Sequence, residues 1–181
     1  MQIETTPIAG LLVIKPKVFF DPRGYFFENY NQQAFEEAGL KDLYFVQDNQ
    51  SLSQAGILRG LHFQAPPYEQ GKLVRVIKGA ALDVVVDVRK NSATYGEHYK
   101  LELTEENFLM LWIPPGFAHG FLTLKDDTIF CYKCTGLYDK ASEMGIMWND
   151  PQLNIDWGII DPILSDKDRE NVSFQNFNSP F

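Results

Sequence analysis

The feature that most constrains the fold is a period-two alternation of apolar and polar residues, which begins at Leu43 and runs through most of the chain. Successive side chains of a β-strand point to opposite faces of a sheet, so this alternation predicts strands that lay one face on a core. Turn-forming sequences such as Gln54-Ala55-Gly56 and Pro66-Pro67 separate the segments. The predicted strands are 44–51, 57–63, 72–77, 81–89, 98–103, 109–113, 118–124, 129–135 and 145–148.

Before Leu43 the pattern is less regular. We expect short strands at 11–14, 17–20 and 25–30, and a helix at 32–38 between an Asn31 N-cap and Gly39. A second short helix is predicted at 165–170. Because no helical pattern interleaves with the strands, the chain is predicted to be mainly β, an antiparallel sandwich or jelly-roll barrel rather than a parallel sheet.

Composition sets the scale of the protein and argues against some partners. A chain of 181 residues with 45% hydrophobic residues suits one domain with one sizeable core. The net charge of −8 argues weakly against nucleic acid, although local arginines and lysines could still bind a small anion. The N-terminal sequence has no secretory pattern, and no run of about 18 apolar residues occurs. We therefore expect a cytoplasmic protein without a membrane segment.

Two cysteines, Cys131 and Cys134, form a single C-x-x-C. No second pair is available to complete four zinc ligands, and residues three apart in a strand face opposite sides of the sheet. We interpret both cysteines as small strand residues in a reducing compartment.

Ionisable residues occur in strands where core would be expected. Lys72 and Arg75 fall on opposite faces of segment 72–77, so one of the two must point inward. Asp83 and Asp87 share one face of segment 81–89, and general burial statistics favour solvent-facing positions for both.

His62 lies in the apolar sequence LRGLHFQ, from Leu58 to Gln64. A buried, hydrogen-bonded histidine and a catalytic one are both compatible with this setting. Gly60 indicates a bulge or a close backbone approach. In a regular strand Arg59 and His62 would face opposite sides, so a bulge is required if both serve one pocket.

His119 follows the rigid turn Pro114-Pro115-Gly116, and the pattern Pro-x-Gly-x-x-His resembles the second motif of the cupin superfamily. This resemblance implies a cupin-type jelly-roll barrel. Metal-binding cupins carry His-x-His in the first motif, whereas Gln64 stands two residues after His62. The departure favours chemistry without a metal or other cofactor, against a metal-dependent dioxygenase or ketoisomerase.

Several longer segments resemble a narrower family. KVFFDPRGYFFENY, FVQDNQS, LRGLHFQ, QGKLVR, DVVVDVRKNSATYG, LWIPPGFAHGF, YKCTGLY and WND occur in this order between about Val13 and Asp168. Together they are similar to the dTDP-4-dehydrorhamnose 3,5-epimerases, which make a rhamnose precursor. The resemblance implies epimerisation of a dTDP-4-keto-6-deoxy sugar at both carbons that flank the ketone.

The resemblance also implies a role for each site residue. His62 matches the catalytic base, and Asp168 matches the carboxylate that orients it, although Ser165-x-x-Asp168 alone would be read as a helix cap. Tyr132 matches the proton donor on the opposite face of the sugar, and Lys72 the cation beside the keto oxygen. The matching substrate-binding residues are Phe19, Arg23, Glu28, Gln47, Asn49, Arg59, His119, Tyr138, Glu143 and Lys167, with Arg23 and Arg59 on the diphosphate and Phe19 and Tyr138 as candidates to stack on thymine.

In that family the N-terminal strands pair with a partner subunit, so a single 1–181 domain forming a homodimer is expected, with sites that borrow residues across the interface. Three alternatives remain open at this point: a single-carbon epimerase of a related deoxysugar pathway, a cupin ketoisomerase or dioxygenase, and a protein that only binds sugar nucleotides.

Overall fold

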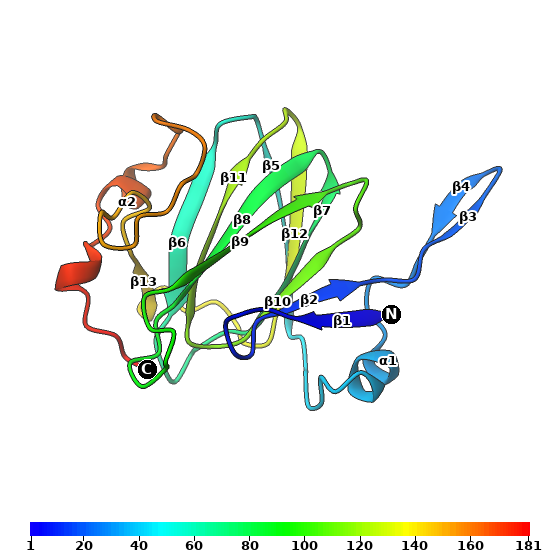
Figure 1. The fold of residues 1–181 in the computed structure, drawn as a ribbon, viewed down its shortest axis with the longest axis horizontal. Coiled ribbons are helices and arrows are strands. Elements are labelled where there is room, and N and C mark those ends of the chain that lie inside the picture. Colours follow the sequence, from blue (N-terminus) through cyan, green and yellow to red (C-terminus); the bar gives the residue numbers. More distant parts are fainter.

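Two antiparallel β-sheets pack face to face in the computed structural model, which describes residues 1–181 (Figure 1). The antiparallel jelly-roll prediction is confirmed. The strands are β1 Gln2–Thr5, β2 Leu12–Lys15, β3 Phe19–Asp21, β4 Gly24–Phe26, β5 Gln47–Ser53, β6 Leu58–Gln64, β7 Lys72–Lys78, β8 Ala80–Asp87, β9 His98–Thr104, β10 Met110–Ile113, β11 Phe117–Thr123, β12 Thr128–Cys134 and β13 Glu143–Gly145.

The larger sheet has the strand order β1-β2-β10-β7-β12-β5, and the smaller one β13-β6-β11-β8-β9. Apart from the consecutive pairs β1-β2 and β8-β9, neighbours in each order are not consecutive in the sequence, which is typical of a jelly roll rather than a meander. This topology brings β5 and β12 of one sheet opposite β6 and β11 of the other. Segments that lie far apart along the chain and carry the candidate site residues are therefore close together in space.

The short helices lie outside the sheets: α1 Gln32–Glu37, α2 Asp166–Arg169 and the 3₁₀ turn η1 Phe174–Asn176. Asn31 caps α1 by accepting a hydrogen bond from the Ala34 N–H at 3.1 Å, and Gly39 follows with a φ of +98°. Both end signals are thus confirmed. Neither α-helix has the length or apolar character that crossing a bilayer requires.

Some boundaries differ from the prediction. β5 starts at Gln47 rather than Tyr44, whose side chain is exposed. β4 ends at Phe26, and β13 ends at Gly145 instead of extending to Trp148. β1 was not predicted, because its sequence QIET has too little apolar alternation; pairing with β2 forms it.

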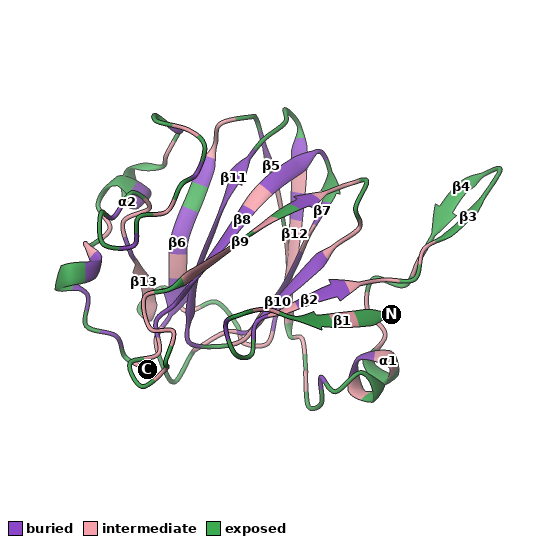
Figure 2. Cartoon of the chain, viewed as in Figure 1, coloured by how far each residue is buried: buried purple, intermediate pink, exposed green.

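Apolar side chains form three clusters, and the smallest packs Phe35 of α1 against Ile14, Leu73 and Met110 of the larger sheet. Val74, Val85, Phe121 and Phe130 belong to the cluster between the sheets. A second cluster covers the other face of the smaller sheet, where Val84 and Val86 lie beneath the C-terminal segment that carries Trp157 and Phe174. In Figure 2 the strands at the centre are therefore mostly buried. β8 is covered on both faces.

The solvent-facing interpretation of Asp83 and Asp87 is wrong. Both side chains are fully buried, because their face of β8 points between the sheets while Val84 and Val86 pack under the C-terminal segment. A strand covered on both faces gives no polar alternation to mark an outer side. Each carboxylate has a partner: His119 for Asp83 and Arg89 for Asp87.

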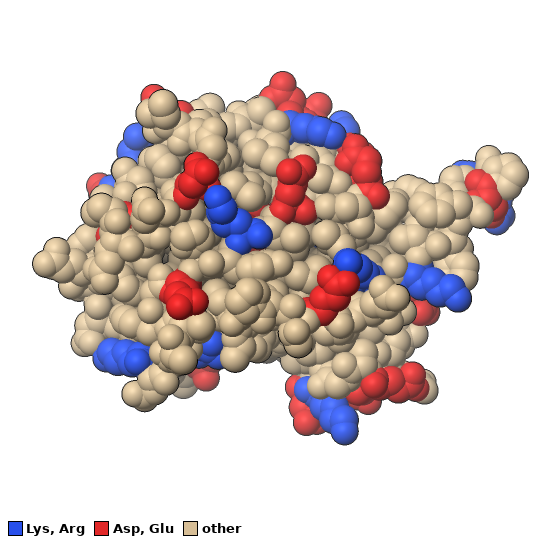
Figure 3. Space-filling model, in the orientation of Figure 1, with Lys and Arg blue, Asp and Glu red and all other residues tan.

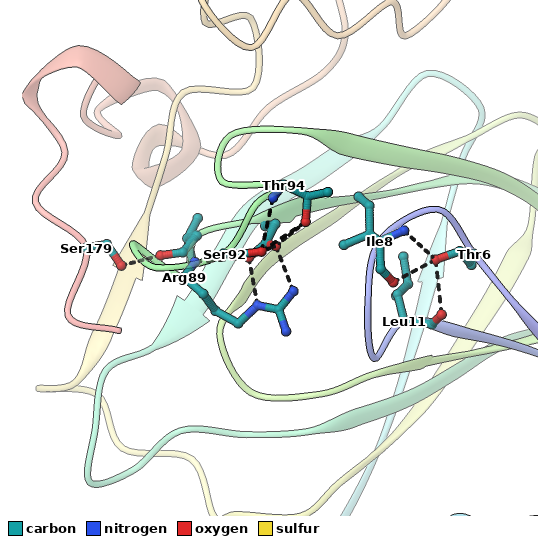
Figure 4. Close-up of polar contacts among 9 residues, drawn as sticks. Thr6, Ile8, Leu11, Arg89, Ser92, Thr94 and Ser179 are labelled. Carbon is teal, nitrogen blue, oxygen red and sulfur yellow. Dashed lines mark hydrogen bonds and ion pairs between the residues drawn. The ribbon is translucent and has the colours of Figure 1, made fainter.

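The Asp87 cluster consists of Asp87 with Arg89, Ser92 and Thr94, at the end of β8. Arg89 donates from Nε at 2.8 Å and from a terminal nitrogen at 2.7 Å, and both hydroxyls donate to Oδ2. Figure 4 shows Arg89, Ser92 and Thr94 beside Ser179 of the C-terminal segment and near the Thr6–Leu11 loop. These hydrogen bonds outweigh the effect of burial, which acts in the opposite direction, and lower the pKa of Asp87 to about 2.

The β3–β4 hairpin projects away from the barrel and pairs with no other strand (Figure 1). Its aromatic side chains are largely uncovered: Phe20 is 71% and Phe26 66% exposed. On the remaining surface drawn in Figure 3, acidic and basic residues intermix without a band of one sign. Phe20 and Tyr25 of the hairpin contact the Phe108 ring, with centroids 6.1 and 4.9 Å from it.

Candidate active site

A bulge in β6 aims an arginine and a histidine at the same space. His62 lies opposite His119 on β11, and Arg59 lies opposite Phe121, so β6 has one extra residue in this stretch. Gly60 sits there with a φ of +130°, and a Cβ on it would lie 2.5 Å from the Gly120 Cα. The predicted bulge and the predicted close approach are both present. Arg59 and His62 consequently line one hollow.

The His62 ring bonds through Nε2 to the Asp168 carboxylate of α2. Ser165 caps α2 and also donates its hydroxyl to the second oxygen of Asp168 at 2.8 Å. Burial acts to raise the pKa of Asp168, but the bonds from His62 and Ser165 outweigh it and hold that pKa below its ordinary value. Ser165 therefore caps α2 and holds the Asp168 carboxylate against His62 at the same time. The other ring nitrogen of His62 is free for a ligand.

Lys72, at the start of β7, points between the sheets, while Arg75 points to the outer face and lies over the Phe27 ring. The prediction that one of these two cations turns inward is confirmed for Lys72. The Lys72 ammonium has no hydrogen-bond acceptor and no ion-pair partner within the chain. Its surroundings are partly apolar. Burial lowers its pKa, and the nearby Cys134, Glu143 and Asp83 act in the opposite direction.

Tyr132 lies on β12, across from Val74 and Asn49 in the register of the larger sheet. Its side chain also packs against the cluster between the sheets. Burial, followed by the neighbouring Cys134, raises the pKa of Tyr132, and Arg59 lowers it only in part. The phenol therefore keeps its proton at neutral pH and can donate it.

His119 and Asp83 form a second imidazole–carboxylate pair, with 2.8 Å between Nε2 and Oδ2. The His119 side chain is 7% exposed and that of Asp83 is fully buried. Phe121 and Phe130 stack beside them, with ring centroids 3.9 Å apart. This pair is thus enclosed by aromatic rings, whereas the His62 side chain is 24% exposed.

We use "the cavity" for two adjoining hollows of about 400 and about 120 Å³ that share His62, Lys72 and Tyr132 in their walls. The imidazole and the phenol come from opposite sheets and face the same space. The other charged or polar residues of the walls are Gln47, Asn49, Ser51, Arg59, Gln64, Gln70, His119, Tyr138, Glu143, Ser165 and Asp168.

Hydrogen bonds connect the residues at the rim of the cavity. Tyr138 donates its hydroxyl to Glu143 at 2.8 Å, and Lys167 forms an ion pair with the same carboxylate. Gln47 donates to Asn49 at 3.0 Å and accepts from the Tyr138 N–H at 2.9 Å. Burial opposes the effect, yet the bonds from Lys167 and Tyr138 keep the pKa of Glu143 below its ordinary value.

Known proteins match both the sequence and this geometry. The sequence model of the dTDP-4-dehydrorhamnose 3,5-epimerase family matches residues 5–176. The chain belongs to this family. A relative with that name from Shigella flexneri is 49% identical, with 96% of each chain covered.

Two solved structures of dTDP-sugar 3,5-epimerases are similar throughout. The enzyme from Bacillus anthracis, with TDP and PPi bound, has a TM-score of 0.93 and 42% identity over 96% of this chain and 99% of that one. The enzyme from Legionella pneumophila, in complex with dTDP-4-keto-L-rhamnose, has a TM-score of 0.93 and 44% identity over 98% and 94%. The 3,5-epimerase resemblance read from the sequence is confirmed.

Three residues expected in the site of a 3,5-epimerase lie elsewhere in this single chain. Phe19 and Arg23 are on the projecting hairpin, and Glu28 follows it. Arg23 bonds to Asp21 within the hairpin, and Glu28 accepts from Asn31 at 3.2 Å. None of the three lines the cavity. A role for them in substrate binding therefore requires the hairpin of another copy.

Gln64 occupies the position where metal-binding cupins place a second histidine of the first motif. Its amide nitrogen donates to the carbonyls of Tyr68 and Leu137, at 2.6 and 3.1 Å, and its oxygen accepts from the Asp139 N–H. Gln64 therefore ties two loops together. No group of three or more His, Cys, Asp or Glu side chains has metal-binding proximity in this chain.

Sequence reasoning missed Asp83 and Ser51 as neighbours of the site. Asp83 was interpreted as a surface residue because Leu82, Val84 and Val86 form an apolar face opposite it, which in a half-buried strand is the core face. Ser51 lines the cavity on the same face of β5 as Gln47 and Asn49, so the two-residue spacing of those polar side chains was the signal.

The cysteines face opposite ways, as predicted: Cys134 is buried near Asn49 and Cys131 lines an outer hollow.

Proposed function

We propose that this protein epimerises dTDP-4-dehydro-6-deoxy-D-glucose at both carbons that flank its ketone and so forms dTDP-4-dehydro-L-rhamnose. The observation that supports it most is the pair of rings in the cavity, where the His62 imidazole and the Tyr132 phenol reach one space from opposite sheets. Inverting a carbon requires a base on one side and an acid on the other. The family to which the chain belongs carries out this chemistry in its named members.

In this proposal His62 removes a proton from the carbon next to the ketone through the ring nitrogen that Asp168 leaves free. Asp168 stabilises the imidazolium that forms and fixes the ring. The electron pair of the broken C–H bond moves to the keto oxygen, which becomes an enolate. Lys72 lies in the cavity without a partner in the chain, so its ammonium is available to this oxygen.

Tyr132 then returns a proton to the opposite face of the same carbon. Its raised pKa keeps the phenol protonated before this step. The enolate collapses to the ketone, and the carbon has changed configuration. The same sequence at the second flanking carbon completes the reaction, with proton exchange from solvent restoring His62 and Tyr132 between the two inversions.

Solvent deuterium labels each carbon that is inverted, so product formed in D₂O tests the proposal. We expect deuterium at both carbons that flank the ketone, read by mass spectrometry and NMR. Label at only one carbon would assign the chain to single-carbon epimerases instead. The absence of label and turnover with folded protein would overturn the proposal and leave nucleotide-sugar binding alone.

The nucleotide end of the substrate is assigned to the rim of the cavity. Arg59 is close enough to Ser53 to donate from its Nε at 3.3 Å, and its guanidinium suits diphosphate oxygens. The sugar and nucleotide are proposed to bind Gln47, Asn49, His119, Glu143 and Lys167. Tyr138 is proposed to stack on the thymine ring. These side chains line or border one continuous opening.

We further propose a homodimer in which the β3–β4 hairpin of one copy brings Phe19, Arg23 and Glu28 to the cavity of the other. The uncovered aromatic side chains of the hairpin support this. Isologous dimers exchange such elements symmetrically.

Mixing two inactive variants tests whether sites are shared. His62→Asn lacks the base, and Arg23→Ala lacks the hairpin arginine. In a mixed dimer with shared sites, one cavity has its own His62 and the partner's intact Arg23, so random mixing should restore about a quarter of full activity. Activity no higher than that of the separate variants, or a monomer in sedimentation, would contradict the shared site.

A further inference from the structure

Glutamine side chains hold a short loop at the rim of the cavity. This rim loop, Gly136–Asp139, lies between the end of β12 and the start of β13. Its residues form no backbone–backbone hydrogen bonds, and their main-chain groups bond to the side chains of Gln47, Gln64 and Gln70 instead. Gln47 begins β5, Gln64 ends β6, and Gln70 lies just before β7. Three separate parts of the barrel therefore converge on one loop.

Gln64 bonds the rim loop on both sides of Tyr138. Its Nε2 donates to the Leu137 carbonyl at 3.1 Å, and its Oε1 accepts from the Asp139 N–H at 2.7 Å. The same nitrogen also donates to the Tyr68 carbonyl at 2.6 Å, and the side chain is only 5% exposed. A carboxamide carries the same donor and acceptor groups as a peptide unit. Gln64 thus takes the place that a neighbouring strand would have in a sheet.

The other two glutamines bond the adjoining main-chain groups. Gln70 donates to the Gly136 carbonyl at 2.7 Å, and Gln47 accepts from the Tyr138 N–H at 2.9 Å. Each residue of the rim loop therefore has a main-chain group bonded to a glutamine. Surface loops that lack such bonds open most easily, so these contacts hold the rim loop in one conformation.

The rim loop presents the Tyr138 ring. This side chain is 54% exposed and lines the smaller hollow of the cavity. Its hydroxyl donates to Glu143 at 2.8 Å, and Glu143 in turn forms an ion pair with Lys167. The ring is thus fixed at its backbone and at its hydroxyl while one face stays open. An aromatic surface ordered in advance loses little conformational entropy when a planar base stacks on it.

We infer that Gln64 is a positioning residue for the nucleotide end of the substrate, because it fixes the backbone on both sides of Tyr138 and so presents that ring to the base. Gln70 assists at the start of the rim loop. Stacking of the base on Tyr138 rests on the proposed function, whereas the glutamine contacts do not. The Gln64 nitrogen already donates to two carbonyls of the chain, so the effect of Gln64 reaches the ligand through Tyr138.

Calorimetric binding of thymidine diphosphate tests the inference. Gln64→Met keeps the length of the side chain and removes its hydrogen bonds to the rim loop. Tyr138→Ala removes the ring, and the double variant shows whether Gln64 acts through it, since a residue that acts only through another adds nothing once that one is gone. Gln54→Met is the matched control, because Gln54 donates to Asp127 at 3.1 Å on an exposed loop and lines neither hollow.

We expect Tyr138→Ala to weaken binding by roughly tenfold, the scale of losing one stacked base. Gln64→Met should weaken it by about fivefold, because the apparent affinity scales with the fraction of molecules whose ring is in place. Added to Tyr138→Ala, the same change should cost less than about twofold. Gln54→Met should bind like the wild type. Unchanged affinity in folded Gln64→Met, or an equal loss with and without the Tyr138 ring, overturns the inference.

Amide hydrogen exchange of the wild type keeps the inference testable should Gln64→Met not fold. The Asp139 N–H has no backbone acceptor, so its protection depends on Gln64 Oε1. We expect the Asp139 amide to exchange at least about tenfold more slowly than an unprotected amide. Exchange at the unprotected rate would show that Gln64 does not hold the rim loop, and would overturn the inference.

Turnover separates this inference from the proposed function. With the 4-keto sugar nucleotide as substrate, Gln64→Met should raise KM by about fivefold and leave kcat within about twofold of the wild type, since His62 and Tyr132 keep their places. A fall in kcat at unchanged KM would place the effect of Gln64 on the reacting sugar and overturn the inference. Wild-type protein that binds thymidine diphosphate without any turnover would overturn the proposed epimerisation, while the binding comparison among the variants would still decide the role of Gln64.

Discussion

The Asp87 cluster and the cavity both contain buried charge, but they differ in how completely their polar atoms are used. In the Asp87 cluster both carboxylate oxygens accept hydrogen bonds, and none of its members lines the cavity. In and around the cavity, the Lys72 ammonium has no partner in the chain, and Asp83 Oδ1 and Ser51 Oγ have none either. The carboxylate of the scaffold thus has a full set of hydrogen bonds, whereas the Lys72 ammonium and the Ser51 hydroxyl in the cavity walls are left for a ligand to bond. Glu69 Oε2 and Asn171 Nδ2 are also buried without a partner but lie outside the cavity.

The comparison predicts its largest effect for His62→Asn. This change removes the base, and turnover should fall on the order of a hundredfold or more, the usual scale for losing general-base catalysis. The free energy of unfolding should change by only about 1 kcal/mol or less, because asparagine can still bond to Asp168. Steady-state kinetics and urea unfolding measure the two quantities.

His98→Asn is the matched control for this variant, because His98 lies on β9 and lines neither part of the cavity. Its turnover should remain at the wild-type level. Near-normal turnover in His62→Asn, or an equal loss in His98→Asn, would contradict the assignment of His62 as the base.

Asp87→Asn should show the opposite pattern. The Asp87 cluster loses the charge that strengthens its hydrogen bonds, so the free energy of unfolding should fall by about 2 kcal/mol. Turnover per folded molecule should not change. Asp156→Asn is a control on an exposed aspartate, 3.9 Å from Lys100, and should have almost no effect on stability. A loss of turnover in folded Asp87→Asn would erase the distinction between the two regions.

The stabilisation from Asp87 should also depend on pH in a defined direction. Its pKa is lowered to about 2 in the folded protein from the ordinary 3.8, so the folded state favours the ionised form. The stabilisation is fully present above about pH 4 and disappears as the pH falls through about 2. The difference in unfolding free energy between wild type and Asp87→Asn should therefore shrink between pH 4 and pH 2. A difference that stayed constant over this range would show that charge is not its source.

Much of the fold followed from local patterns in the sequence. Sequence patterns predicted the strands of both sheets except β1, and Gly60 predicted the bulge that brings Arg59 and His62 to one space. Asn31 and Gly39 marked the ends of α1 correctly. These features depend on residues that are close together in the sequence, so the sequence alone could predict them.

The contacts within the site were harder to predict from the sequence. Asp168 lies 106 residues from His62, and only the family resemblance joined the two before the fold was known. Asp83 was misread because burial of both faces of β8 depends on the C-terminal segment, which is far away in sequence. Contacts that depend on topology leave no periodic signal in the strand itself.

Ser165→Ala is expected to have the smallest effect, because Ser165 serves the scaffold and the cavity at once. Its hydroxyl caps α2 and donates to Asp168, while Asp168 keeps its other oxygen on His62. Loss of the cap should lower the free energy of unfolding by about 1 kcal/mol. Turnover should fall by less than roughly tenfold, since the base keeps its partner. Ser173→Ala is the control, because Ser173 precedes η1 without a side-chain cap bond and should change neither quantity. Equal behaviour of the two serine variants would mean that α2 needs no cap to hold Asp168 against the imidazole.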